Sequence, residues 1–263
     1  MIIKELIEFL NITAPFNTAE SYDNVGLLTG NELDEIQGVC CCLDITRGII
    51  DEAYSKKANV ILSHHPVIFN GLKTIAPWNP VTELIRRDIA AIAIHTNFDV
   101  APNGVNENLV KLLDFKSVGL NKISRFENGY GIVCDISKPF NPRELAEYCK
   151  SRLHLKSVMY SRGSEDGNSP NNIKRIAVCC GGGVDNDTMR YARDNHCDAI
   201  ISGDIKHNFW IEAENCSMTL INAGHYGTEK GAVPLMAEIL TEKFPEITVF
   251  TSETEKEPFE YCF

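Results

Sequence analysis

Short, strongly apolar runs alternate with longer stretches of mixed character along this chain. The first ten residues place apolar side chains at helical spacing among charged ones, which predicts an amphipathic helix rather than a signal peptide. Runs around residues 39–41, 60–62 and 90–94 are almost wholly apolar, as is typical of strands buried on both faces. No run approaches the roughly 18 apolar residues that a membrane-spanning helix needs.

The chain repeats part of its own pattern. Two stretches align without a gap at a constant offset of 139 residues, the distance from Val39 to Val178. The identical pairs are Val39 and Val178, Cys40 and Cys179, Cys41 and Cys180, Ala53 and Ala192, Ile61 and Ile200, and Ser63 and Ser202. Each copy reads as a buried strand, a helix and a second buried strand. Such βαβ units have parallel strands, whose carboxyl ends meet at one edge of a sheet.

This repeat predicts an α/β protein with two similar α/β domains from an internal duplication, each with a mostly parallel sheet flanked by helices. We expect the first half to cover residues 1–125 and the second to cover residues 126–263, with residues 247–251 as a closing strand. Residues 162–172 are polar and rich in turn formers, so they predict a surface loop within the second half.

Composition and charge argue against some classes of binding partner and point to a cellular compartment. The net charge of −11 argues against broad binding to nucleic acid or to anionic membranes, because such binding needs clustered Lys and Arg. The ten cysteines form no Cys-x-x-Cys pair, and several lie inside strand-like runs, where a thiol acts as a small apolar residue. We therefore expect reduced thiols and a cytoplasmic protein.

Candidate metal ligands follow three apolar runs. Residues 63–66 read Ser-His-His-Pro, residues 95–99 read His-Thr-Asn-Phe-Asp, and residues 224–229 read Gly-His-Tyr-Gly-Thr-Glu. Imidazole nitrogens and carboxylate oxygens are ligands of borderline divalent metals. Because these groups follow predicted strands, they indicate one metal centre assembled from distant parts of the chain.

Each candidate in the first half also has a plainer interpretation. Adjacent His64 and His65 at a strand end can reach one cleft, most simply as ligands of two nearby ions; alternatively, one lies in the core and the other at the surface. For Asp99, the role of metal ligand is favoured over the role of helix cap. His95 is either a hydrogen-bond partner that supports a ligand or a substrate contact.

The second half has similar alternatives. His225 and Glu229 are four residues apart, which on a helix would place them on one face, but the flanking Gly224 and Gly227 favour a loop that enters a helix. The plainer role of Glu229 is a first-turn charge that favours the helix dipole, and this role is compatible with metal binding if the amino end of the helix faces the metal. Asp204 and His207 either line the same cleft as acid, base or substrate contacts, or act as a helix cap and a surface histidine. The glycine run at 181–183 is a weak phosphate-binding signal and more simply a tight turn before a helix.

Taken together, five ordered motifs resemble the Nif-three-like family, whose bacterial members carry the name GTP cyclohydrolase 1 type 2 homologue. The motifs occupy residues 23–27, 63–66, 95–99, 202–204 and 224–229, and the resemblance covers nearly the whole chain. Tyr22 stands where the family usually has Trp, a change that keeps an aromatic ring. The chain has no room for the extra domain that some relatives carry between the halves.

The resemblance implies two divalent ions per subunit, zinc, iron or manganese, and a ring-shaped homohexamer. The metal ligands that it implies are His64, His65, Asp99, His225 and Glu229. On this basis we expect a metal-dependent hydrolase acting on a nucleotide-like small molecule, with His95, Asp204 and His207 as candidates for proton transfer or substrate contacts. The alternative is a hexameric scaffold that delivers or senses metal, or binds a partner, without catalysis.

Overall fold

The chain folds into two compact units. The computed structural model describes residues 1–127, 130–161 and 172–262, so the predicted loop at 162–172 lies almost wholly outside the described residues. The first unit contains Met1–Gly104 and Ala232–Pro258, and the second contains Val105–Gly231 and the residues from 259 onward.

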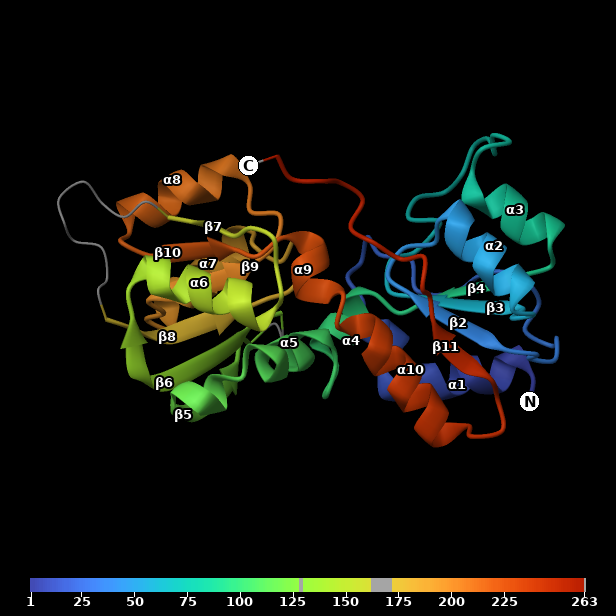
Figure 1. Ribbon diagram of the computed structural model, residues 1–263, viewed down its shortest axis with the longest axis horizontal. Helices are drawn as coiled ribbons and strands as arrows, with labels where there is room; N and C mark the ends of the chain where they lie inside the picture. Colours follow the sequence, from blue (N-terminus) through green and yellow to red (C-terminus); the bar gives the residue numbers. More distant parts are fainter. Residues whose placement is uncertain (128–129, 162–171, 263) are drawn as a thin grey trace. The chain divides into compact units, whose positions relative to one another are not determined.

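The first unit is built on a five-stranded sheet of order β1-β4-β3-β2-β11. Strands β4, β3, β2 and β11 are parallel, and β1 joins the edge in the antiparallel direction. Helices α2 and α3 cover one face of this sheet, and α1 and α10 cover the other (Figure 1). The elements are α1 Ile3–Thr13, β1 Gly26–Thr29, β2 Val39–Cys42, α2 Arg47–Ser55, β3 Val60–Ser63, α3 Pro80–Arg86, β4 Ala90–Ala93, α4 Thr96–Val100, α10 Ala232–Lys243 and β11 Val249–Thr251, with a 3-10 turn at Phe16–Thr18.

The second unit is built on a six-stranded mixed sheet of order β5-β6-β8-β9-β10-β7. Strands β8, β9 and β10 are parallel, whereas β5, β6 and β7 pair in the antiparallel direction. Helices α7 and α8 contribute to the core on one face of the sheet. The elements are α5 Val105–Leu113, β5 Leu120–Arg125, β6 Ile132–Phe140, α6 Pro142–Arg152, β7 Met159–Tyr160, β8 Ile173–Val178, α7 Asn186–Asp194, β9 Ala199–Ser202, α8 His207–Asn215, β10 Thr219–Asn222 and α9 His225–Glu229, with a 3-10 turn at Phe115–Val118.

The sequence repeat appears as corresponding elements of the two units. Helices α2 and α7, and strands β3 and β9, correspond residue for residue at the predicted offset. The helices begin at equivalent caps, where the side chains of Thr46 and Asp185 accept a backbone N–H three residues on. The two-sheet layout is therefore consistent with an internal duplication, and the predicted α/β class is confirmed. The first sheet is mostly parallel as predicted, whereas antiparallel pairs outnumber parallel ones in the second.

Strand pairing differs slightly between the copies. Val39 pairs with Val60, whereas its counterpart Val178 pairs with Ile201, the counterpart of Leu62. The pairing has thus moved by two residues along the partner strand. Because side chains alternate with a period of two, an even shift keeps every side chain on its original face of the sheet.

The units differ from the predicted halves at both boundaries. Residues 105–125 belong to the second unit, because β5 pairs with β6. Residues 232–258 return to the first unit, because β11 pairs in parallel with β2. The predicted closing strand at 247–251 is present as β11, but it completes the sheet of the first unit.

The cysteines behave as apolar core residues. All ten are free thiols, and most of them are buried. Burial raises the pKa of Cys40 and of Cys134 to about 12, so these thiols stay neutral near pH 7. Among the described residues, no helix has both the length and the apolar character needed to cross a membrane.

Candidate metal-binding residues

Three histidines of the first unit form one cluster. His64 and His65 follow β3, and His95 follows β4, so two neighbouring parallel strands bring them to the same sheet edge. The ring centroids are 5.1 Å apart for His64 and His65, 5.2 Å for His64 and His95, and 5.4 Å for His65 and His95. One nitrogen of each ring lies within 4.8 Å of the others, which is close enough for a shared metal site.

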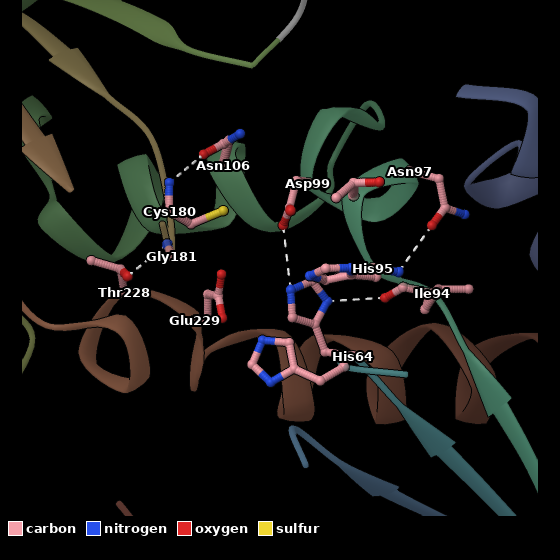
Figure 2. A network of polar contacts seen from close by, with 12 residues as sticks. His64, Ile94, His95, Asn97, Asp99, Asn106, Cys180, Gly181, Thr228 and Glu229 are labelled. Carbon is pink, nitrogen blue, oxygen red and sulfur yellow. Dashed lines mark hydrogen bonds and ion pairs between the residues drawn. The ribbon is translucent and has the colours of Figure 1, made fainter. Parts of the chain in front are cut away.

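Each of these rings is oriented by an oxygen at Nδ1. His64 Nδ1 lies 2.9 Å from the carbonyl oxygen of Ile94, a contact drawn in Figure 2. His65 Nδ1 lies 2.8 Å from Asp44 Oδ1, and His95 Nδ1 lies 2.9 Å from Asp23 Oδ1. Since these oxygens accept hydrogen bonds, Nδ1 carries the proton and Nε2 presents a lone pair. Metal-binding histidines are typically held in this way.

Asp99 adds a buried carboxylate to the cluster. It lies in the short helix α4, and its Oδ1 is 3.4 Å from Nε2 of His64, as Figure 2 shows. It is therefore not the residue that begins α5. The side chain of Asn97 fixes this segment, because it accepts the backbone N–H of His95 and donates to the carbonyl of Ala14.

Asp23 is a supporting residue that sequence reasoning did not single out as a site residue. Its carboxylate accepts hydrogen bonds from His95 Nδ1 and from the backbone and hydroxyl of Thr96. Burial raises the pKa of Asp23, but the hydrogen bonds from His95 and Thr96 outweigh that effect and hold the pKa below its usual range. The ionised carboxylate orients the His95 ring through Nδ1. Its only signal in the sequence is its place in the motif at residues 23–27.

A further carboxyl group near the histidines comes from the end of the first unit. Glu255 accepts a hydrogen bond from the backbone N–H of Leu43, directly after β2. Burial raises the pKa of Glu255 to about 7, and the charge of Asp44 adds to this effect. No local pattern marks Glu255, because it follows the unpredicted return of the chain to the first sheet.

The second unit holds His225 and Glu229 on one face of α9. His225 Nε2 lies 2.8 Å from Glu229 Oε2, the contact that a four-residue spacing gives on a helix. The segment is helical from His225 onward, whereas the flanking glycines had favoured a loop that enters a helix. Glu229 is buried and ends α9, so the alternative of a first-turn charge does not apply. His225 Nδ1 lies 2.8 Å from Asp204 Oδ2, which repeats the arrangement of the other three histidines.

Two glycines make room for this pair. A Cβ added at Gly181 would lie 1.9 Å from Glu229 Oε1, and the φ angle of this residue is +54°. A Cβ added at Gly203 would lie 2.6 Å from the backbone nitrogen of His225. Gly181 also donates its N–H to the Thr228 hydroxyl at 3.0 Å (Figure 2). The run at 181–183 thus forms a turn before α7 whose first residue must be small.

The three predicted catalytic candidates have different surroundings. His95 lies in the histidine cluster. Asp204 orients His225 and does not cap α8, because Lys206 occupies the capping position. His207 is exposed on the first turn of α8.

The donor set fits a borderline divalent metal. Imidazole nitrogens and carboxylate oxygens suit zinc, iron or manganese. The first unit offers the histidine cluster with Asp99, and the second offers His225 with Glu229. The ring orientations provide the support that such ligands need.

Comparisons with known proteins point to one family. The sequence model of a family described as Duf34/NIF3 (NGG1p interacting factor 3) matches residues 1–258. A Campylobacter jejuni protein is 33% identical over 266 residues, covering 99% of this chain and 100% of the relative. A Clostridium perfringens protein is 30% identical over 268 residues, with the same coverage. Both relatives carry the name GTP cyclohydrolase 1 type 2 homolog.

Solved structures agree over the whole length. A crystal structure of the Staphylococcus aureus protein SA1388 superposes with a TM-score of 0.84 and 29% identity, covering 100% of this chain and 99% of that one. Reduced HcgD from Methanocaldococcus jannaschii gives a TM-score of 0.79 and 25% identity, covering 96% and 98% of the two chains.

Proposed function

The chain belongs to the Duf34/NIF3 family, and from this membership we propose that it is a metal-dependent hydrolase acting on a nucleotide-like substrate. We propose two divalent ions per chain, zinc, iron or manganese, with ligands from both units. These ligands are His64, His65, Asp99, His225 and Glu229. In such centres the ions make water nucleophilic at neutral pH and polarise the bond that is attacked.

One observation carries this proposal. Four histidines, three in the first unit and one in the second, each direct Nδ1 at an oxygen acceptor. A histidine that only fills a core needs no such common arrangement, whereas a metal ligand needs its lone pair fixed at the other nitrogen. The buried carboxylates of Asp99 and Glu229 supply the negative charge that divalent cations require.

Other residues of the chain have supporting roles in this proposal. His95, oriented by Asp23, is a candidate for passing a proton to or from a substrate. Asp204 and His207 remain candidates for proton transfer or substrate contact, and the contact of Asp204 with His225 favours a positioning role. A more specific form of the proposed hydrolase activity is hydrolytic ring opening of GTP, which the names of the curated relatives suggest.

We also propose a homohexamer and a cytoplasmic location. The free, buried thiols support the location, because a reducing compartment keeps thiols in this state. The hexamer follows from family membership.

Metal analysis and a GTP assay test the proposed activity. We expect two ions per chain in the purified protein, and a change in the ultraviolet spectrum of GTP as its ring opens. His65→Ala and Glu229→Gln, which alter one ligand in each unit, should both lower the metal content and abolish turnover. His196→Asn, at an exposed histidine of the second unit, is the control and should change neither.

Turnover of GTP that persists in the metal-depleted protein would contradict a metal-dependent reaction. An unchanged metal content in Glu229→Gln would contradict a centre that uses ligands from both units. If the two ligand variants lose metal but the wild-type protein does not turn over GTP, the metal centre stands and GTP ring opening is removed as its activity.

A further inference from the structure

An aromatic surface adjoins the histidine cluster of the first unit. Phe69 lies 6.1 Å from the ring of His95, and the two rings meet edge to face. The ring of Tyr22 lies 6.1 Å from Phe69 at a tilt of 38°. Tyr22 is 60% exposed and Phe69 is 41% exposed, so large parts of both rings face solvent beside a polar site.

A hydrogen bond joins the two segments that carry these rings. The side-chain amide of Asn24 donates to the carbonyl oxygen of Ile68 at 2.6 Å, which ties the segment of Tyr22 to the segment of Phe69. The neighbouring Asp23 holds His95 through Nδ1. Residues 22–24 thus fix Phe69 and His95 together, and a surface fixed in advance loses little entropy when a ligand binds.

These contacts favour recognition of a flat ring. Exposed apolar rings gain little from contact with phosphate or sugar hydroxyls, whereas they stack well on a planar heterocycle. A ring stacked on Phe69 lies beside His95, the candidate proton carrier. An aromatic surface at this position suits the part of a substrate that is next to the reactive groups.

We propose that Tyr22 and Phe69 form a stacking surface for the planar nitrogen heterocycle of the substrate. This inference rests on the proposed hydrolase function and deepens it, because it names the chemical class that the site selects. The heterocyclic ring is recognised by stacking, and the phosphates of a nucleotide contribute less to selection.

Binding to the metal-loaded full-length protein tests this proposal without requiring turnover. Calorimetry would compare GTP, ATP and UTP with inorganic triphosphate, which has no ring. We expect at least one nucleotide to bind roughly tenfold more tightly than triphosphate, the lower range of base stacking on aromatic side chains. Phe69→Leu and Tyr22→Leu should each remove most of this difference and leave triphosphate binding unchanged. Phe69→Trp keeps an aromatic ring at this position and should retain the preference for nucleotide over triphosphate.

Tyr54 provides a matched control, since it is also 60% exposed and lies on α2. Tyr54→Leu should bind nucleotides as the wild type does. The metal content and melting temperature of each variant show whether it is folded. The proposal is overturned if no nucleotide binds, if triphosphate binds as tightly as the nucleotides, or if Phe69→Leu retains wild-type nucleotide affinity.

These outcomes separate the stacking surface from the proposed reaction. Binding of GTP that depends on Phe69, without turnover, supports the stacking surface and removes GTP ring opening. Turnover of GTP that does not change in Phe69→Leu or Tyr22→Leu supports the reaction and removes the stacking surface.

Discussion

The orientation of single histidine rings is the most informative feature at the scale of the residue. Adjacent His64 and His65 were predicted from the sequence to share a site, and both belong to the cluster with His95. The oxygen that orients each ring was not predictable, because Asp23 is 72 residues from His95 and Asp44 is 21 residues from His65. Such pairs form only when separate loops come together at a sheet edge.

Removal of one orienting carboxylate should weaken metal binding without removing a ligand. In Asp204→Ala, His225 loses the acceptor at Nδ1, so its Nε2 is less basic and less well oriented. We expect metal affinity to fall about 10- to 100-fold, the usual effect of losing such a partner. Competition with a chromogenic chelator measures this affinity.

Asp187→Ala is the control for this experiment, because Asp187 is similarly exposed and pairs with Arg190 on the surface of α7. It should retain wild-type affinity. Equal affinities in Asp204→Ala and Asp187→Ala would show that Asp204 does not support a metal ligand.

A second residue-scale prediction concerns Gly181. In Gly181→Ala the new methyl group meets the carboxylate of Glu229, and an alanine must adopt a positive φ angle. We expect a loss of about 1–2 kcal/mol in the free energy of unfolding from the backbone alone, and weaker metal binding from the displaced carboxylate. Urea unfolding and chelator competition measure the two effects.

Gly182→Ala serves as the neighbouring control, since a Cβ at Gly182 has no atom within 4 Å and its φ angle is not in the left-handed region. Its stability and metal affinity should match those of the wild type. If Gly181→Ala behaves in the same way, the close approach of Glu229 to residue 181 is not required for the site.

At the scale of elements, the return of the chain to the first sheet is secured by one buried carboxylate. Glu52 on α2 accepts hydrogen bonds from Ser252, Glu253 and Thr254, directly after β11. Lys56 forms an ion pair with the same carboxylate. Burial raises the pKa of Glu52, but the hydrogen bonds outweigh it and lower the pKa from 4.5 to about 2.

This lowered pKa predicts a pH-dependent contribution to stability. Because the folded-state pKa lies below the unfolded value, the contribution is fully present above pH 4.5 and is lost as the pH falls toward 2. Glu52→Gln should therefore cost about 1–3 kcal/mol at pH 7, and the difference from wild type should shrink as the pH falls through this window.

Urea unfolding of both proteins between pH 7 and pH 3 measures this trend. Glu242→Gln, at an exposed position of α10, is the control and should follow the wild type at every pH. A difference between Glu52→Gln and wild type that stays constant down to pH 3 would contradict an ionised Glu52 as the cause.

At the scale of the whole molecule, we predict an assembly of six chains. Light scattering coupled to size exclusion should give a particle of six times the 29.3 kDa of one chain. A monomer at micromolar concentration would contradict the hexamer, while the metal content of the same sample would still test the metal centre independently.

The sequence by itself determined the features that depend on local pattern. Apolar runs located the buried strands, the constant offset located the corresponding helix and strand of the two units, and the polar residues after those strands located the ligand candidates. The four-residue spacing of His225 and Glu229 marked them as a pair on one face if the segment is helical, which the flanking glycines left open.

Tertiary structure alone decided the features that depend on long-range pairing. The assignment of residues 232–258 to the first unit follows from hydrogen bonds between β11 and β2, which no local periodicity encodes. The same is true of the carboxylates that orient His65, His95 and His225, and of the rings of Tyr22 and Phe69 beside the cluster. Local pattern specifies which residues reach a sheet edge, but the packing of loops at that edge specifies which of them touch.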